Sequence, residues 1–186
     1  MRSYGYHVSH GRKGHGDMSR IRLDIGSVVV GGGPVASVIT LKPHDEVPGL
    51  GLVQLPIRIG IAEASSISAA LAHVPLARPL THDLLASTVR SLGARLEDVT
   101  ISRVEGTTFY ATIRLTEKDG GEVTLDARPS DAIALAMRMG APLFAETSVL
   151  ETASYPDFGA VRESEQEEQL ASFHSFVEGL SPQDFE

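Results

Sequence analysis

The stretch of residues 107–140 reads TTFYATIRLTEKDGGEVTLDARPSDAIALAMRMG. In its first ten residues the apolar side chains alternate with polar ones, which is typical of a strand with one buried face. The members of that face are Phe109, Ala111, Ile113 and Leu115. Residues 118–121 (KDGG) are a tight hairpin signal, and residues 122–127 have the composition of a second strand. This stretch therefore predicts an antiparallel hairpin.

A helix is predicted directly after the hairpin, over residues 130–139, with Ser130 as its cap and Gly140 and Pro142 ending it. Two further helices are predicted over residues 63–74 and over residues 81–92, the latter with Thr81 as N-cap. Strands are predicted over 21–30, 35–41, 50–59 and 98–104. Because strands and helices do not alternate regularly, we expect an α+β fold with a mostly antiparallel sheet packed against about three helices.

The composition is that of a globular domain: 186 residues, 42% hydrophobic and 22% charged. Cysteine is absent, which excludes disulfides, zinc-thiolate sites and a cysteine nucleophile. The longest nearly uncharged stretch, residues 28–41, is shorter than the ~20 residues of a membrane span. No apolar secretory segment follows the basic N-terminus, so we expect a cytoplasmic protein without a membrane segment.

Three segments are predicted along the chain. Residues 1–17 are rich in glycine and polar groups and are expected to be a disordered arm, and residues 18–150 form the domain. Residues 151–186 are predicted to be an acidic linker and a short C-terminal amphipathic helix, opened by a capping box of Ser164 and Glu167. The apolar side of that helix is Leu170, Phe173, Phe176, Val177 and Leu180. Such a side docks on its own domain or on a partner chain. Together with the possible free strand edges it predicts a homodimer.

The net charge of −8 is concentrated near the C-terminus. Residues 145–186 carry ten acids against one arginine, whereas residues 21–144 are near balance. A strong nonspecific grip on a phosphate backbone needs a basic stripe, and the middle of the chain has no such run. A DNA or RNA substrate would therefore have to bind at a local site without an evident basic patch.

Residues 31–36 (GGGPVA) match the spacing of a dinucleotide-binding fingerprint. That motif must open a helix, whose N-terminus meets the pyrophosphate. Here β-branched residues follow Pro34 and indicate a strand, so we interpret the glycines as a turn and expect no nucleotide cofactor.

Two junctions between a loop and a helix have a similar composition: residues 78–83 (RPLTHD) and 126–131 (DARPSD). Each joins an arginine, a proline, a hydroxyl residue and an acid where a helix begins. The unpaired N–H groups of a first helical turn, with an arginine beside them, suit a phosphate oxygen. His82 is a candidate general base. The alternative is that Pro129, Ser130 and Asp131 only cap the helix.

Four motifs together resemble the bifunctional nuclease domain family. They are residues 55–64 (LPIRIGIAEA), 78–85 (RPLTHDLL), 108–111 (TFYA) and 126–136 (DARPSDAIALA). The resemblance covers roughly residues 20–150, and residues 181–185 are similar to the ends of many bacterial members. It implies an α+β domain and nuclease activity on DNA and RNA. The chain departs from the family pattern at Arg58, where an aromatic residue is usual, at Ile61-Ala62, and over residues 28–49.

The nuclease interpretation assigns roles to residues of these motifs. The candidate catalytic residues are Glu63, His82, Asp83, Arg128 and Asp131. The candidate phosphate-binding residues are Arg78, Thr81, Arg128 and Ser130. The candidate ligands of a divalent ion, expected to be Mg²⁺ or Mn²⁺, are Asp83, Asp126 and Asp131. Two other functions stay open: a noncatalytic module that binds a small anionic ligand or a protein partner, and an oligomerisation scaffold. A shared cleft for His82 and Arg128 would favour a functional site at these junctions, whereas positions on opposite faces would exclude a nuclease with a single site.

Overall fold

The structure is a computed structural model that describes residues 20–32, 35–73, 77–157 and 159. Its eight strands form one sheet in the order β6-β5-β4-β7-β1-β2-β3-β8. The strands are β1 (Arg20–Val29), β2 (Ser37–Pro43), β3 (Val53–Ile59), β4 (Arg95–Glu105), β5 (Thr108–Thr116), β6 (Glu122–Ala127), β7 (Leu143–Glu146) and β8 (Tyr155–Pro156). All neighbouring strands are antiparallel except β4 and β7. The predicted α+β fold with a mostly antiparallel sheet is confirmed.

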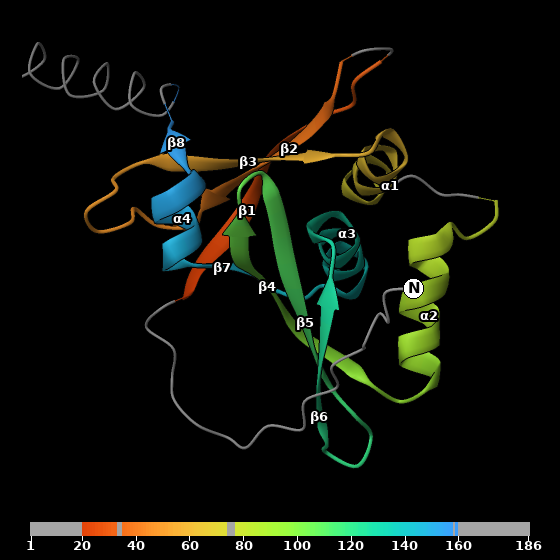
Figure 1. The fold of residues 1–186 in the computed structure, drawn as a ribbon. Helices are drawn as coiled ribbons and strands as arrows, with labels where there is room; N and C mark the ends of the chain where they lie inside the picture. Colours follow the sequence, from red (N-terminus) through yellow and green to blue (C-terminus); the bar gives the residue numbers. More distant parts are fainter. Residues whose placement is uncertain (1–19, 33–34, 74–76, 158, 160–186) are drawn as a thin grey trace, which may run out of the picture.

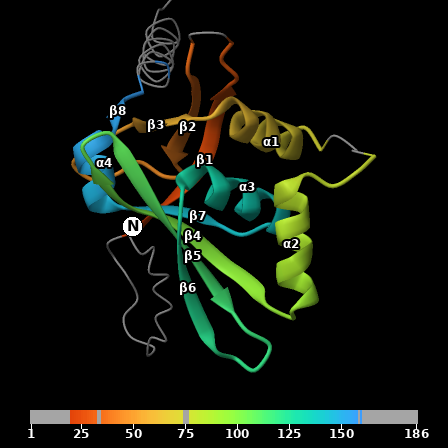
Figure 2. The same ribbon diagram turned by 45° about the vertical axis from the view of Figure 1, so that its right-hand side comes forward.

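The described part of the chain has four helices: α1 (Ile61–Leu71), α2 (Thr81–Ser91), α3 (Pro129–Met139) and α4 (Thr147–Ala153). Helices α1, α2 and α3 lie together on one side of the molecule, and α4 lies on the other (Figure 1, Figure 2). The three predicted helices are therefore α1, α2 and α3. None of the helices in the described residues is long and apolar enough to cross a membrane.

The ends of the helices differ in detail from the sequence prediction. Thr81 and Ser130 are not the capping residues, because the N-caps of α2 and α3 are Leu80 and Arg128. Pro129 occupies the first position of α3, where its missing N–H costs no hydrogen bond. Gly140 ends α3 with φ of +69°, a backbone conformation that glycine adopts without strain.

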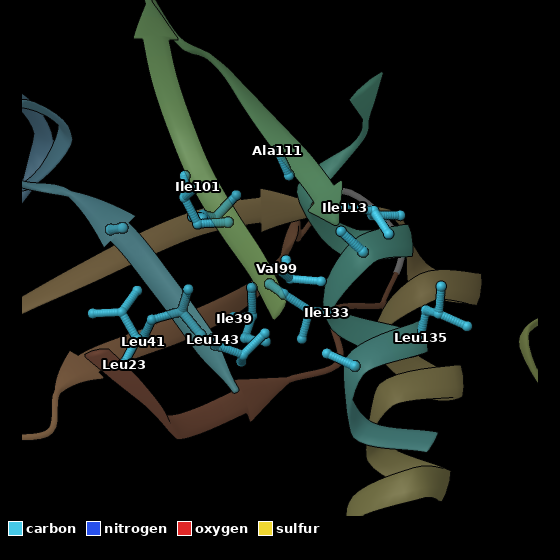
Figure 3. Close-up of a cluster of buried hydrophobic side chains, with 14 of the residues drawn as sticks. Leu23, Ile39, Leu41, Val99, Ile101, Ala111, Ile113, Ile133, Leu135 and Leu143 are labelled. Carbon is cyan, nitrogen blue, oxygen red and sulfur yellow. The ribbon is translucent and has the colours of Figure 1, made fainter. Parts of the chain in front are cut away.

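Helix α3 is the central element of the core. Its Ile133 and Leu135 are almost completely buried. Ile133 faces apolar side chains of β2, β4 and β5, whereas Leu135 lies on the opposite side of the helix (Figure 3). Burying each of these side chains contributes roughly 2 kcal/mol. The helix also packs against α1 and α2. Because the core holds α3 in place, the start of α3 at Arg128 has a fixed position at the end of β6.

Three elements were absent from the sequence prediction: β7, α4 and β8. The predicted linker began at Glu151, but Glu151 belongs to α4, whose Val149 and Leu150 are buried. The first residues of that linker are therefore part of the domain. The predicted arm of residues 1–17 and the predicted C-terminal helix lie outside the described residues.

The glycine-rich stretch after β1 leads into a strand, β2, as the sequence predicted. Strands β1 and β2 pair antiparallel from Val29 and Val38 to Leu23 and Pro43. The motif therefore does not have the strand-to-helix context that a dinucleotide fingerprint requires.

Candidate functional site

A cavity of about 350 Å³ lies where the first turns of three helices meet. It is lined by Ala62, Glu63 and Ser66 of α1, by Leu80, Thr81 and His82 at the start of α2, and by Arg128 and Asp131 at the start of α3. The two junctions predicted from the sequence thus share one cavity, and His82 and Arg128 both line it. We call it the three-helix cavity.

Arg128 connects α1 with α3 across this cavity. Its Nε and Nη2 donate to the two oxygens of Asp131 at 2.7 and 3.0 Å, and Nη2 lies 2.9 Å from Oε1 of Glu63. The hydrogen bond to Asp131 raises the pKa of Arg128 further above its ordinary value. The side chain of Arg128 remains 66% exposed. Its guanidinium is therefore held in place and is still accessible from solvent.

Gly60 makes room for the carboxylate of Glu63. A Cβ at residue 60 would lie 2.1 Å from Oε2 of Glu63. The glycine thus lets Glu63 fold back over the start of α1 toward Arg128.

His82 connects α2 with both other helices. Its Nε2 lies 3.2 Å from Oδ1 of Asp131 and its Nδ1 lies 2.9 Å from Oγ of Ser66. Burial alone would raise the pKa of Asp131, but hydrogen bonds from Arg128 and His82 outweigh it and hold the pKa below its ordinary value. Ionised Asp131 only accepts hydrogen bonds, so Nε2 of His82 carries the hydrogen. In the neutral ring, Nδ1 then accepts from the Ser66 hydroxyl.

Arg138 lies two turns along α3 from Asp131 and was not among the predicted site residues, although it contacts both α1 and α2. Its Nε donates to Oδ1 of Asp83 at 2.5 Å, and its Nη2 donates to the carbonyl and the hydroxyl of Ser66 at 3.2 and 3.1 Å. The Arg138 side chain is only 8% exposed. It therefore fixes the mutual position of α1, α2 and α3.

Asp83 belongs to this contact with Arg138 rather than to the three-helix cavity. Its second oxygen accepts the backbone N–H of Leu80 at 2.8 Å. The hydrogen bonds from Arg138 and Leu80 lower the pKa of Asp83. With Arg138, Asp83 lines a separate cavity of about 680 Å³.

Together these contacts form one continuous polar network, which runs through Glu63, Arg128, Asp131, His82, Ser66, Arg138 and Asp83. All three acids of the network, Glu63, Asp83 and Asp131, occupy the third position of their helices. The interaction of a carboxylate at this position with the helix dipole stabilises the helix by roughly 0.3–1 kcal/mol. Asp131 therefore stabilises the start of α3, as the alternative interpretation of its motif predicts, and also makes contacts in the cavity.

The other predicted site residues are dispersed. Thr81 lines the three-helix cavity, whereas Arg78 is exposed in the loop before α2 and does not line it. Ser130 is buried and lines a neighbouring cavity of about 480 Å³. Asp126 is exposed on β6, where Leu125 and Ala127 pack toward the core, so its side chain points to the opposite face.

The carboxylates assigned to a divalent ion do not form a common site. Asp131 gives both oxygens to Arg128, Asp83 gives its oxygens to Arg138 and Leu80, and Asp126 lies elsewhere. Among the described residues, no group of three histidine or carboxylate side chains is placed to hold a metal ion. The residues therefore do not fit the expected Mg²⁺ or Mn²⁺, and we derive no chemical step through such an ion.

The lowered pKa of Asp131 predicts that part of the stability is lost in acid. A carboxylate whose pKa is lower in the folded than in the unfolded protein stabilises the fold above about pH 5 and loses this effect as the pH falls below about 4. We expect an Asp131→Asn variant to be less stable than the wild-type protein at pH 7, with a smaller difference at pH 3. Urea unfolding at a series of pH values measures this. An Asp126→Asn variant is the control, and an equal pH dependence of wild type and Asp131→Asn would contradict the prediction.

Comparison with known proteins places this chain in a family. A family model described as the bifunctional nuclease domain matches residues 49–157, a range that contains all seven residues of the polar network. Two uncharacterized proteins of Mycobacterium tuberculosis, from strains CDC 1551 and H37Rv, are each 38% identical over 139 residues, which is 70% of this chain and 80% of the relative. The chain therefore belongs to the bifunctional nuclease domain family.

Proposed function

We propose that this protein hydrolyses phosphodiester bonds of DNA or RNA at the three-helix cavity. The observation that carries the proposal is that residues from three separate motifs line one cavity: Glu63, His82, Arg128 and Asp131. Membership of a nuclease family supports the same class of reaction.

Arg128 is suited to bind the scissile phosphate. Its planar fork already makes a bidentate contact with a carboxylate, and a phosphate presents two oxygens in a similar arrangement. The exposed side chain can exchange Asp131 for a phosphate oxygen without unfolding its surroundings. The first turns of α1, α2 and α3 add partial positive charge at the cavity.

His82 is suited to accept the proton of the attacking water. Nε2 is committed to Asp131 and Nδ1 accepts from the Ser66 hydroxyl, so this hydroxyl passes its hydrogen to Nδ1 and takes the proton of the attacking water in its place. The water oxygen forms a bond to phosphorus, the bond from phosphorus to the leaving oxygen breaks, and solvent protonates the leaving oxygen. Asp131 orients the ring and stabilises the imidazolium that forms.

A cleavage assay on single-stranded DNA and RNA tests this proposal. We expect His82→Gln to lower kcat about 100-fold, because general base catalysis supplies at least that factor, with little change in KM. His44→Gln is a matched control, since His44 pairs with Asp24 on an exposed surface.

The assay is run with Mg²⁺, with Mn²⁺ and with a chelator. A wild-type protein that cuts neither nucleic acid under any of these conditions would overturn the proposal. That result would favour a noncatalytic module that binds an anionic ligand at Arg128. Equal rates for His82→Gln and wild type would overturn the role of His82 alone.

A further inference from the structure

A second cavity adjoins the three-helix cavity and shares Arg128 with it. It has a volume of about 480 Å³ and lies between the end of β3, the turn that joins β4 to β5, and the start of α3. Its polar and aromatic lining consists of Arg58, Thr107, Thr108, Phe109, Arg128 and Ser130. Because Arg128 lines both spaces, a ligand in the second cavity lies directly beside the proposed reaction site.

The second cavity is the more positive of the two. Arg58 and Arg128 line it, and none of its lining residues is acidic. The three-helix cavity instead contains the carboxylates of Glu63 and Asp131. Arg58 is exposed, and its side chain has no hydrogen-bond or ion-pair partner within the part of the chain that the structure describes. Its charge is therefore available to an anionic ligand.

Phe109 adds an aromatic surface to this positive cavity. The residue is half-buried at the start of β5, next to the exposed hydroxyl residues Thr107 and Thr108. An aromatic ring beside basic groups is how proteins hold a single strand of nucleic acid, because the ring stacks on a base and the cations bind the backbone. A small free anion would use the arginines but would gain nothing from Phe109.

We infer that the second cavity binds the nucleotide of single-stranded DNA or RNA next to the cleaved bond, with its base against Phe109, the scissile phosphate at Arg128 and the following phosphate at Arg58. This inference rests on the proposed function, since it takes the substrate to be nucleic acid. The cavity has the size of a small-ligand site, so it suits one nucleotide. In a duplex the faces of each base are covered by neighbouring pairs, and Phe109 cannot reach them.

Binding of a fluorescently labelled dT12 oligonucleotide, measured by anisotropy at several salt concentrations, tests the role of Arg58. We expect Arg58→Gln to raise Kd about tenfold and to reduce the slope of log K against log salt by about 0.7, the value for one phosphate contact to a single strand. Arg22→Gln removes the same charge from an exposed position outside both cavities and is expected to change neither quantity.

A Phe109→Leu variant tests the stacking contact separately. We expect Kd to rise about fivefold or more while the salt slope stays as in wild type, because stacking releases no counterion. Melting temperatures of all variants are compared, and dT12 is checked by gel to be intact after each measurement. A dT12·dA12 duplex is expected to bind more weakly than dT12, with no effect of Phe109→Leu.

The inference is overturned if wild type does not bind dT12, if Arg58→Gln leaves both Kd and salt slope unchanged, or if the duplex binds as tightly as the single strand. These outcomes are separate from failure of the proposed function. Binding of dT12 through Arg58 without cleavage by the wild type would overturn the nuclease and retain the strand-binding site. Cleavage by the wild type with no effect of Arg58→Gln on binding would overturn the strand-binding site and retain the nuclease.

Discussion

An Arg128→Lys variant is expected to cleave nucleic acid about 100-fold more slowly than the wild-type protein, the usual cost of losing one preorganised donor to the developing charge. Lysine keeps the positive charge but lacks the planar fork that contacts both oxygens of Asp131 and reaches Glu63. The side chain of Arg128 is 66% exposed, so its ion pairs contribute little to stability. We therefore expect the melting temperature to change by no more than a few degrees, about the effect of 1 kcal/mol.

An Arg103→Lys variant is the matched control for this experiment. Arg103 is also an exposed arginine in an ion pair, with Glu105, but it lines neither the three-helix cavity nor the second cavity. Cleavage rates and melting temperatures are measured for both variants. If Arg128→Lys lowers the melting temperature strongly and leaves the rate per folded molecule unchanged, Arg128 is a bridge between α1 and α3 and not a phosphate-binding group.

Local signals explain which parts of the fold could be predicted. The hairpin of β5 and β6 is set by alternation and by a tight turn around Gly120, so its position was predicted within a residue or two. Strand β7 has only four residues, and its pairing with β4 joins segments more than 40 residues apart, such as Val99 and Leu143. Nothing in a window of that length distinguishes such a strand from the end of a loop.

The distinction between local signals and contacts of distant residues also applies to the site. His82 and Asp131 could each be selected from the sequence because each lies in the first turn of a helix beside an arginine and a proline. Their contact at 3.2 Å joins residues 49 positions apart, and only the packing of α2 against α3 produces it. Asp126 is the opposite case. It was selected because it lies in the same motif as Asp131, but the alternation along β6 turns its side chain to the other face of the sheet.

Ser66 and Arg138, the two members of the polar network that were not predicted, have weaker sequence signals of a role at the site. Ser66 lies three residues after Glu63, so the two share a face of α1, and that spacing could have drawn attention to it. Arg138 lies seven residues after Asp131 on α3, again on one face. A buried arginine is unusual, but a sequence alone does not show that this side chain is buried between three helices.

We expect replacement of Arg138 by methionine to lower the free energy of unfolding at pH 7 by about 2 kcal/mol, because hydrogen bonds of a buried side chain are lost while Asp83, which is 32% exposed, stays partly solvated. Methionine fills similar space but leaves Asp83 without its charged partner and the Ser66 carbonyl without its donor. For a chain of this length the melting temperature should fall by about 4–8 °C. Urea unfolding followed by circular dichroism measures the effect.

The pH dependence of that loss distinguishes the ion pair from simple packing. Arg138 lowers the pKa of Asp83, so the pair stabilises the fold above about pH 5 and the effect is lost as the pH falls below about 4. The difference between wild type and Arg138→Met should therefore be largest near pH 7 and smaller at pH 3. An Arg90→Met variant is the control, because exposed Arg90 makes a single hydrogen bond to the Arg138 carbonyl. A loss of stability that is equal at both pH values would show that Arg138 acts through its packed alkyl chain, and that the contact with Asp83 does not hold α2 on α3.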